Sequence, residues 1–139
     1  MPTSADLLLD TSAAVPFLVR THVAHAATHQ ATSKKRLGLA GHAAFETFSV
    51  ITRLPEPSRV SPDKAALMLR HNFPHTRHLS ARRANELIAK LARSAISGGA
   101  VYDALVAAAA VEHGCVLMTR DARALNTYSA MGADVILLK

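Results

Sequence analysis

Residues 6–13 read DLLLDTSA, and this stretch decides the fold class. Three consecutive leucines between two aspartates form an apolar run too short for a helix, and the residues after it are ones that begin helices. We therefore predict a buried strand that ends at Asp10 and runs directly into a helix. Thr11 or Ser12 would cap that helix, and Pro16 would lie close to its first turn. A strand without polar alternation is typical of a parallel sheet that helices cover on both faces.

The same order of a short apolar run and a longer helical pattern recurs along the chain. Further strands are predicted at LGLA (37–40), CVLMT (115–119) and DVILL (134–138), with a weaker one at TRHLS (76–80). Apolar spacing and capping residues predict the intervening helices over 23–32, 42–54, 61–73, 80–96, 100–113 and 122–132. This alternation predicts a single three-layer α/β/α domain over residues 1–139, with a central, mostly parallel sheet.

The composition and charge of the chain limit the kinds of ligand and location that are expected for it. Half of the 139 residues are hydrophobic, and 16 Lys and Arg against 10 Asp and Glu give a net charge of +6, as in proteins that bind polyanions. Nine basic and three acidic residues lie between Arg53 and Arg93, whereas only six residues are aromatic, so phosphate contact rather than base stacking is expected. No membrane-spanning run or export signal is evident, which predicts a cytoplasmic protein. Cys115, the single cysteine, is expected to be buried.

Four acidic residues fall where such a fold binds ligands. Asp10 ends the first strand and Asp121 follows the strand CVLMT, so both are expected at the carboxyl edge of the sheet. Asp103 lies near the start of one helix, and Glu46 lies inside another. Acids that converge on one cleft repel one another unless they hold a divalent cation, and oxygen ligands favour Mg²⁺ or Mn²⁺. Each aspartate could instead be only a helix cap or a first-turn acid, but capping does not explain Glu46.

The motifs that contain these acids resemble the PIN domain, and within it the VapC-type toxins of bacterial toxin-antitoxin pairs. They are LLLDTSA (7–13), HAAFETFSVITRL (42–54), GGAVYDALVAAAA (98–110) and VLMTRDARAL (116–125). The acids stand at steps of 36, 57 and 18 residues, none is missing, and the resemblance covers the chain from Leu7 to Leu138.

This resemblance implies an endoribonuclease that depends on Mg²⁺ or Mn²⁺ and leaves a 5′-phosphate and a 3′-hydroxyl. Asp10, Asp103 and Asp121 would hold the metal, and Glu46 would complete the set as a ligand or by orienting a water molecule. Neighbouring hydroxyl groups could hold the carboxylates in place or merely cap helices; they belong to Thr11, Ser12 and Thr119. The implied partners are an RNA substrate, a VapB-type antitoxin and a second copy of the chain in a homodimer.

Two other interpretations stay open at this point. A phosphoryl-transfer domain of the haloacid-phosphatase or receiver type also places an aspartate after its first strand. The phosphatase motif, however, needs a second aspartate where this chain has Ser12. A non-catalytic RNA- or protein-binding module of the same fold would keep the basic surface without needing four acids.

Overall fold

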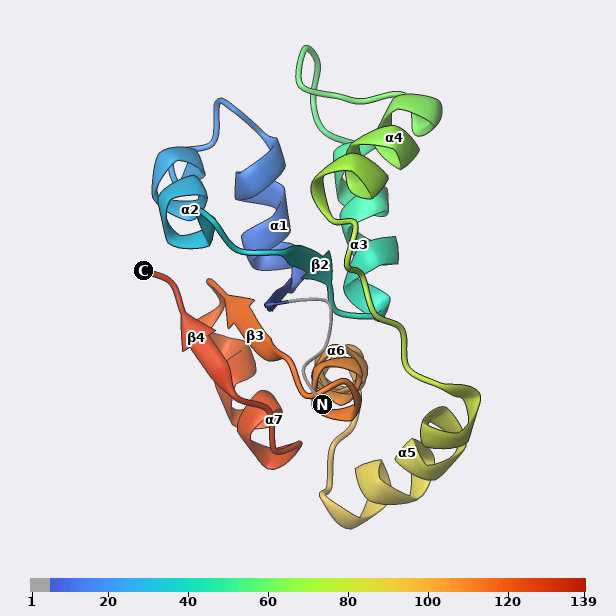
Figure 1. Ribbon diagram of the computed structural model, residues 1–139. Helices are drawn as coiled ribbons and strands as arrows, with labels where there is room; N and C mark the ends of the chain where they lie inside the picture. Colours follow the sequence, from blue (N-terminus) through green and yellow to red (C-terminus); the bar gives the residue numbers. More distant parts are fainter. Residues whose placement is uncertain (1–5) are drawn as a thin grey trace.

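A computed structural model describes residues 6–139; residues 1–5, part of the N-terminus expected to lack an export signal, lie outside the described residues. The described chain forms a three-layer α/β/α domain around a parallel sheet of four strands (Figure 1). The strands are β1 (Leu7–Leu9), β2 (Leu37–Leu39), β3 (Val116–Thr119) and β4 (Val135–Leu137), in the spatial order β2-β1-β3-β4. These four predicted strands and the fold class are therefore confirmed.

Helices cover both faces of the sheet. They are α1 (Thr11–Leu18), α2 (His25–Thr32), α3 (His42–Ile51), α4 (Pro62–Asn72), α5 (Ala81–Arg93), α6 (Ala100–Glu112) and α7 (Leu125–Ala130), with a short 3-10 helix, η1 (Ala122–Ala124), before α7. Leu8 of β1 packs into a core shared with α5, α6 and α7, whereas Leu7 and Leu9 pack into a second core with α1. Because successive residues of a strand face opposite sides, a strand buried on both faces needs an apolar residue at every position.

The remaining helices extend away from the sheet. Figure 1 shows α3 and α4 side by side at one end of the molecule, and α5 at the other end. The basic residues between Arg53 and Arg93 are thus divided between two separate parts of the surface. Among residues 6–139, no helix has the length and apolar character required to span a bilayer. Cys115 is buried, as predicted.

The start of α1 differs from the prediction. The cap is Asp10 rather than Thr11 or Ser12, and its Oδ1 accepts a hydrogen bond from the backbone N–H of Ala13 at 3.2 Å. A carboxylate at this position also interacts favourably with the positive end of the helix dipole. Pro16 consequently lies inside α1 rather than in its first turn. The short helix tolerates it because proline removes only one hydrogen bond of the helical ladder, to the carbonyl of Ser12.

Other helix starts follow the predicted capping chemistry, but several ends come earlier than predicted. Ser61 and Ser80 cap α4 and α5 through their side chains. The helix predicted over 42–54 ends at Ile51. Pro55 has no N–H to bond the carbonyl of Ile51, which accepts instead from the backbone N–H of Val60 at 3.0 Å. The helix predicted over 80–96 ends at Arg93, and the one over 122–132 is split into η1 and α7.

The weak strand predicted at 76–80 is not formed. Residues 75–77 instead run parallel to the outer edge of β2, to which they donate two backbone hydrogen bonds of 3.0 and 3.2 Å. Between these two bonds the hydroxyl of Thr76, not a backbone carbonyl, accepts from the backbone N–H of Leu39 at 2.9 Å, and only an isolated bridge between Ala40 and Arg77 forms. Gly38 permits this approach, since a Cβ atom there would lie 2.6 Å from the backbone nitrogen of Thr76 and closer still to the carbonyl of His75.

Candidate functional site

The carboxyl ends of the two central strands place two of the predicted acids. Leu9 of β1 is in register with Met118 of β3, so that Asp10 and Thr119 come next to each other at the end of the sheet. The backbone N–H of Asp10 continues the ladder by donating to the carbonyl of Met118 at 3.1 Å. Asp121 follows two residues after Thr119, where the chain leaves the sheet.

The other two acids come from helices that begin at the same edge. β2 ends beside β1, and Gly41 then turns the chain into α3 with φ +51, a conformation that suits glycine. Its backbone N–H donates to the carbonyl of Arg77 at 2.7 Å, which fixes the direction of α3. Glu46 lies one turn into α3, and Asp103 lies in the first turn of α6, against which α3 packs.

Asp10 is buried, with 4% of its surface exposed, and three donors surround its carboxylate. Oδ1 accepts from the hydroxyl of Ser12 at 2.6 Å and from the backbone N–H of Ala13 at 3.2 Å. Oδ2 accepts from the hydroxyl of Tyr128 at 2.7 Å. Such donors replace the water that a buried carboxylate loses. Asp10 is therefore a helix cap, as one interpretation proposed, but capping accounts for only one of its three hydrogen bonds.

Hydroxyl groups connect the end of β1 to the end of β3. Ser12 Oγ lies 3.1 Å from Thr119 Oγ1 and accepts from the backbone N–H of Arg120 at 2.8 Å. Thr119 Oγ1 in turn accepts from the backbone N–H of Asp121 at 3.0 Å. Thr119 is fully buried. Ser12 and Thr119 thus link the segments that carry Asp10 and Asp121.

Burial and like charges act on Glu46 and Asp103. The pKa of Glu46 is raised mainly by burial and further by the charges of Asp103 and Asp10. His42, one turn earlier on α3, and the hydroxyl of Thr11, 3.4 Å from Glu46 Oε1, oppose this shift. The acids therefore lie close enough for their charges to interact.

Asp103 experiences a similar environment. Its pKa is raised first by burial, then by the charges of Asp121 and Asp10, and Arg123 partly offsets the shift. Asp121 itself caps η1 and pairs with Arg123 at 3.4 Å. The side chain of Arg123 is 94% exposed, so this ion pair is weak and the guanidinium can reach a ligand. In the described chain, Nε of Arg120 is buried and has no hydrogen-bond partner.

The donor chemistry of these four acids fits a hard divalent cation, because all of them offer carboxylate oxygens. Their mutual repulsion, seen in the raised pKa values of Glu46 and Asp103, is also what a cation would reverse. Across residues 6–139, however, no three His, Cys, Asp or Glu side chains converge closely enough to hold a metal ion. The acids are gathered at one edge without forming a finished coordination sphere.

Two features of the site were missed from the sequence. The hydroxyl of Tyr128 reaches Asp10 across 118 positions of the chain, so no local motif could reveal it. The one available signal was general: a buried tyrosine usually finds a partner for its hydroxyl. The ring of His42 stacks on Tyr102, with ring centroids 5.2 Å apart, and joins α3 to α6 beside Glu46 and Asp103.

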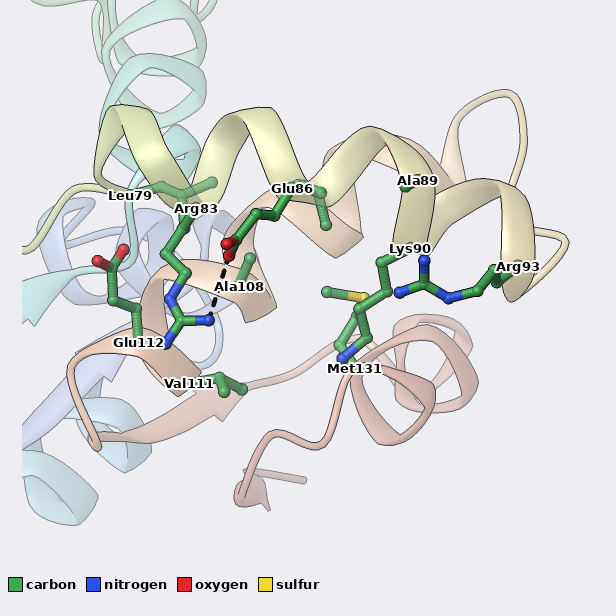
Figure 2. A pocket seen from close by; sticks show the side chains of 11 residues that line it. Leu79, Arg83, Glu86, Ala89, Lys90, Arg93, Ala108, Val111, Glu112 and Met131 are labelled. Atoms are coloured by element: carbon green, nitrogen blue, oxygen red, sulfur yellow. Dashed lines mark hydrogen bonds and ion pairs between the residues drawn. The ribbon is translucent and has the colours of Figure 1, made fainter.

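A groove between α5 and the C-terminal half of α6 lies apart from these acids. It has a volume of about 520 Å³ and an apolar floor that includes Leu87 and Val111. Figure 2 shows its acidic residue Glu86 joined to Arg83, at 3.3 Å. None of the four predicted acids lines this groove, so it is not the candidate catalytic centre.

Comparison with known proteins gives consistent matches. The family model of the PIN domain matches residues 7–129. The chain is 50% identical over 131 residues to Ribonuclease VapC27 of Mycobacterium tuberculosis (strain ATCC 25618 / H37Rv), which covers 94% of this chain and 96% of that protein. It is 38% identical over 130 residues to Ribonuclease VapC40 of Mycobacterium tuberculosis (strain CDC 1551 / Oshkosh), with coverage of 93% and 96%. The crystal structure of FitAcB from Neisseria gonorrhoeae shares the fold, with a TM-score of 0.64 at 18% identity and coverage of 94% of this chain and 96% of that chain.

Proposed function

This chain belongs to the PIN-domain family, and from that premise we propose that it is a Mg²⁺- or Mn²⁺-dependent endoribonuclease that acts as the toxin of a toxin-antitoxin pair. The names of the similar ribonucleases, which match over nearly their full length, support the reaction class. The observation that carries the proposal is the gathering of four acids at one sheet edge, where their charges interact. With the family known, the phosphatase and receiver alternatives are set aside.

We assign each acid the role that its place in the fold allows. Asp10, Asp103 and Asp121 would hold the cation, and Glu46 would complete the set as a ligand or by orienting a water molecule. Because the side chains do not yet converge, some of them would have to turn toward the ion. When bound, the ion would lower the pKa of the attacking water and offset the charge that develops on the scissile phosphate.

Basic groups beside the acids would hold the RNA backbone. Arg123 lies next to Asp121, and its side chain is 94% exposed and so accessible to a phosphate. Contacts of this kind bind phosphates without reading the base sequence. They would position the scissile bond over the carboxylates, while Ser12 and Thr119 keep the two strand ends in place.

RNA cleavage by the purified chain tests this proposal directly. We expect 5′-phosphate and 3′-hydroxyl products in Mg²⁺ or Mn²⁺, and none after chelation with EDTA. Glu46→Gln and Asp103→Asn should each reduce the rate at least 100-fold, on the order of the loss of one essential group at a metal site. Asp63→Asn, which removes an acid from the start of α4, is the matched control and should cleave like the wild type. Metal-independent RNA binding without cleavage would support the non-catalytic module instead.

The partners follow from the family and are tested separately. We expect a VapB-type antitoxin to inhibit cleavage when it is added to the purified chain. We also expect the free chain to sediment as a homodimer at the ionic strength of the cytoplasm, where we expect it to act. Phe45 and Ile88, which are 65% and 70% exposed, are apolar side chains that such partners could cover. A monomer at micromolar concentration would contradict the homodimer without affecting the proposed reaction.

A further inference from the structure

Tyr128 is the largest fully buried side chain of the described residues, and its hydroxyl bonds to a carboxylate of the proposed site. Only 1% of its surface is exposed. Any backbone carbonyl could satisfy a buried tyrosine hydroxyl. Here the acceptor is instead Asp10 Oδ2, at 2.7 Å, at the end of the central strand β1. A core tyrosine is thereby connected directly to the carboxylate cluster.

The hydrogen bonds of Asp10 determine which of its oxygens can accept a ligand. A carboxylate oxygen has about two lone-pair sites. Oδ1 already accepts from Ser12 and Ala13, so both of its sites are used. Within residues 6–139, the one hydrogen bond that Oδ2 accepts comes from Tyr128, which leaves one site of this oxygen open. A cation that binds Asp10 without breaking these bonds must therefore bind the oxygen that Tyr128 also holds.

The segment that carries Tyr128 also carries Asp121. Within residues 119–128, Thr119 and Arg120 at one end contact Ser12, and Tyr128 at the other end contacts Asp10. Asp121 lies between these two contacts. The tyrosine hydrogen bond therefore fixes the distance between two acids that would share a cation, as well as the orientation of one of them.

We propose that Tyr128 is a positioning residue of the cation site, which holds Asp10 Oδ2 so that its remaining lone pair is available to a divalent cation. This inference rests on the proposed function. Hydrogen bonds to metal-binding carboxylates orient them in this way, and their loss typically weakens metal binding 10- to 100-fold.

Calorimetric titration of Mn²⁺ into the Tyr128→Phe variant tests the proposal, since this change removes only the hydroxyl. We expect Mn²⁺ to bind 10- to 100-fold more weakly than to the wild type. Thr28→Val is the matched control. Thr28 is fully buried in α2, and its hydroxyl donates to the carbonyl of Ala24 at 2.7 Å, away from the acids. This variant should lose thermal stability but bind Mn²⁺ with unchanged affinity.

The possible outcomes separate this inference from the proposed function. Equal Mn²⁺ affinity of Tyr128→Phe and the wild type, with binding abolished in Asp103→Asn, would overturn the role of Tyr128 and leave the metal site standing. If the wild type itself takes up no Mn²⁺, both the metal-dependent function and the role of Tyr128 are wrong.

A second measurement does not depend on the folding of a variant. Wild-type protein labelled with 3-fluorotyrosine carries two fluorine probes, at Tyr102 and Tyr128, and Tyr102→Phe assigns the two resonances. Mg²⁺ should shift the Tyr128 resonance with a midpoint equal to the dissociation constant of Mg²⁺, measured by calorimetry on the same labelled protein. A Tyr128 resonance that stays in place at saturating Mg²⁺ would contradict the proposal.

Discussion

The four acids differ in what surrounds their negative charges. Asp10 has three hydrogen-bond donors, two of them from α1 and one from α7. Glu46 and Asp103 are partly buried and feel like charges, so their pKa values are raised. Asp121 has an exposed arginine beside it. Removing each charge should therefore affect folding differently.

Without metal at neutral pH, Glu46→Gln and Asp103→Asn should raise the melting temperature. A carboxyl group whose pKa is raised in the folded state costs no stability below its ordinary pKa of 4.5 or 3.8. It destabilises the fold increasingly as the pH rises through the raised value. Thermal melts at pH 4 and pH 7.5 should thus show the larger gain at the higher pH. A loss of stability in both variants at pH 7.5 would count against a repulsive cluster.

Asp10→Asn should instead lower the melting temperature of the metal-free protein. An amide keeps one acceptor oxygen but places an NH₂ group, a donor, where the Tyr128 hydroxyl now donates. Losing a buried charge-assisted hydrogen bond costs about 1–3 kcal/mol. Chemical denaturation of this variant and of Asp63→Asn, which changes an exposed acid of α4, separates the effect of burial from the effect of removing a negative charge.

Metal and protons should compete for the site. At about 100 times its dissociation constant, a cation that binds only the folded state adds about 2.7 kcal/mol of stability. We expect Mn²⁺ to raise the melting temperature at pH 7.5 and to lose this effect as the pH falls and Glu46 and Asp103 take up protons. A melting temperature that millimolar Mn²⁺ leaves unchanged at pH 7.5 would favour acids that do not share an ion.

Gly38 of β2 controls how the chain covers the outer edge of the sheet. Gly38→Ala should push residues 75–77 away from β2 and cost about 1–3 kcal/mol, because a methyl group would collide with backbone atoms that cannot move aside. Gly99→Ala is the control, since a Cβ atom there meets nothing within 4 Å. Urea denaturation midpoints of the two variants would test this, and equal midpoints would contradict the packing described for this edge.

The apolar patterns predicted where helices form better than they predicted which side of each helix is buried. In α3, Ala43, Thr47 and Ile51 are buried, whereas the large apolar side chain of Phe45 is exposed. In α5, Leu87 is buried, but the adjacent Ile88 is 70% exposed. Apolar spacing shows that a helix has an apolar face, whereas its rotation depends on what it packs against.

Over the whole molecule, the net charge of +6 should make RNA binding sensitive to salt. The basic residues near the acids, rather than those of α5, are expected to matter most. Arg82 lies in the first turn of α5, close to Ser80. The backbone N–H of Ser80 donates to Glu112, which lies at the opposite end of α6 from Asp103. Arg82 is therefore remote from the acids.

Arg123→Ala should therefore weaken RNA binding and reduce the slope of log affinity against log salt by about 1, as expected for the loss of one phosphate contact. Arg82→Ala is closely matched, because Arg82 is also exposed and also paired to an acid, Glu86, at 3.8 Å. It should leave the slope unchanged. Equal slopes for Arg123→Ala and the wild type in fluorescence titrations would place the phosphate contacts elsewhere.

The sequence by itself determined the strands, most helix starts, the three-layer class and the four candidate acids. These follow from local apolar runs, capping residues and short motifs such as LLLDTSA at 7–13, which require no knowledge of distant parts of the chain. Only the tertiary structure decided which residues surround each acid. Residues 10 and 128 meet because parallel strands and the helices between them bring distant segments to one sheet edge, and no pattern within either segment records that contact.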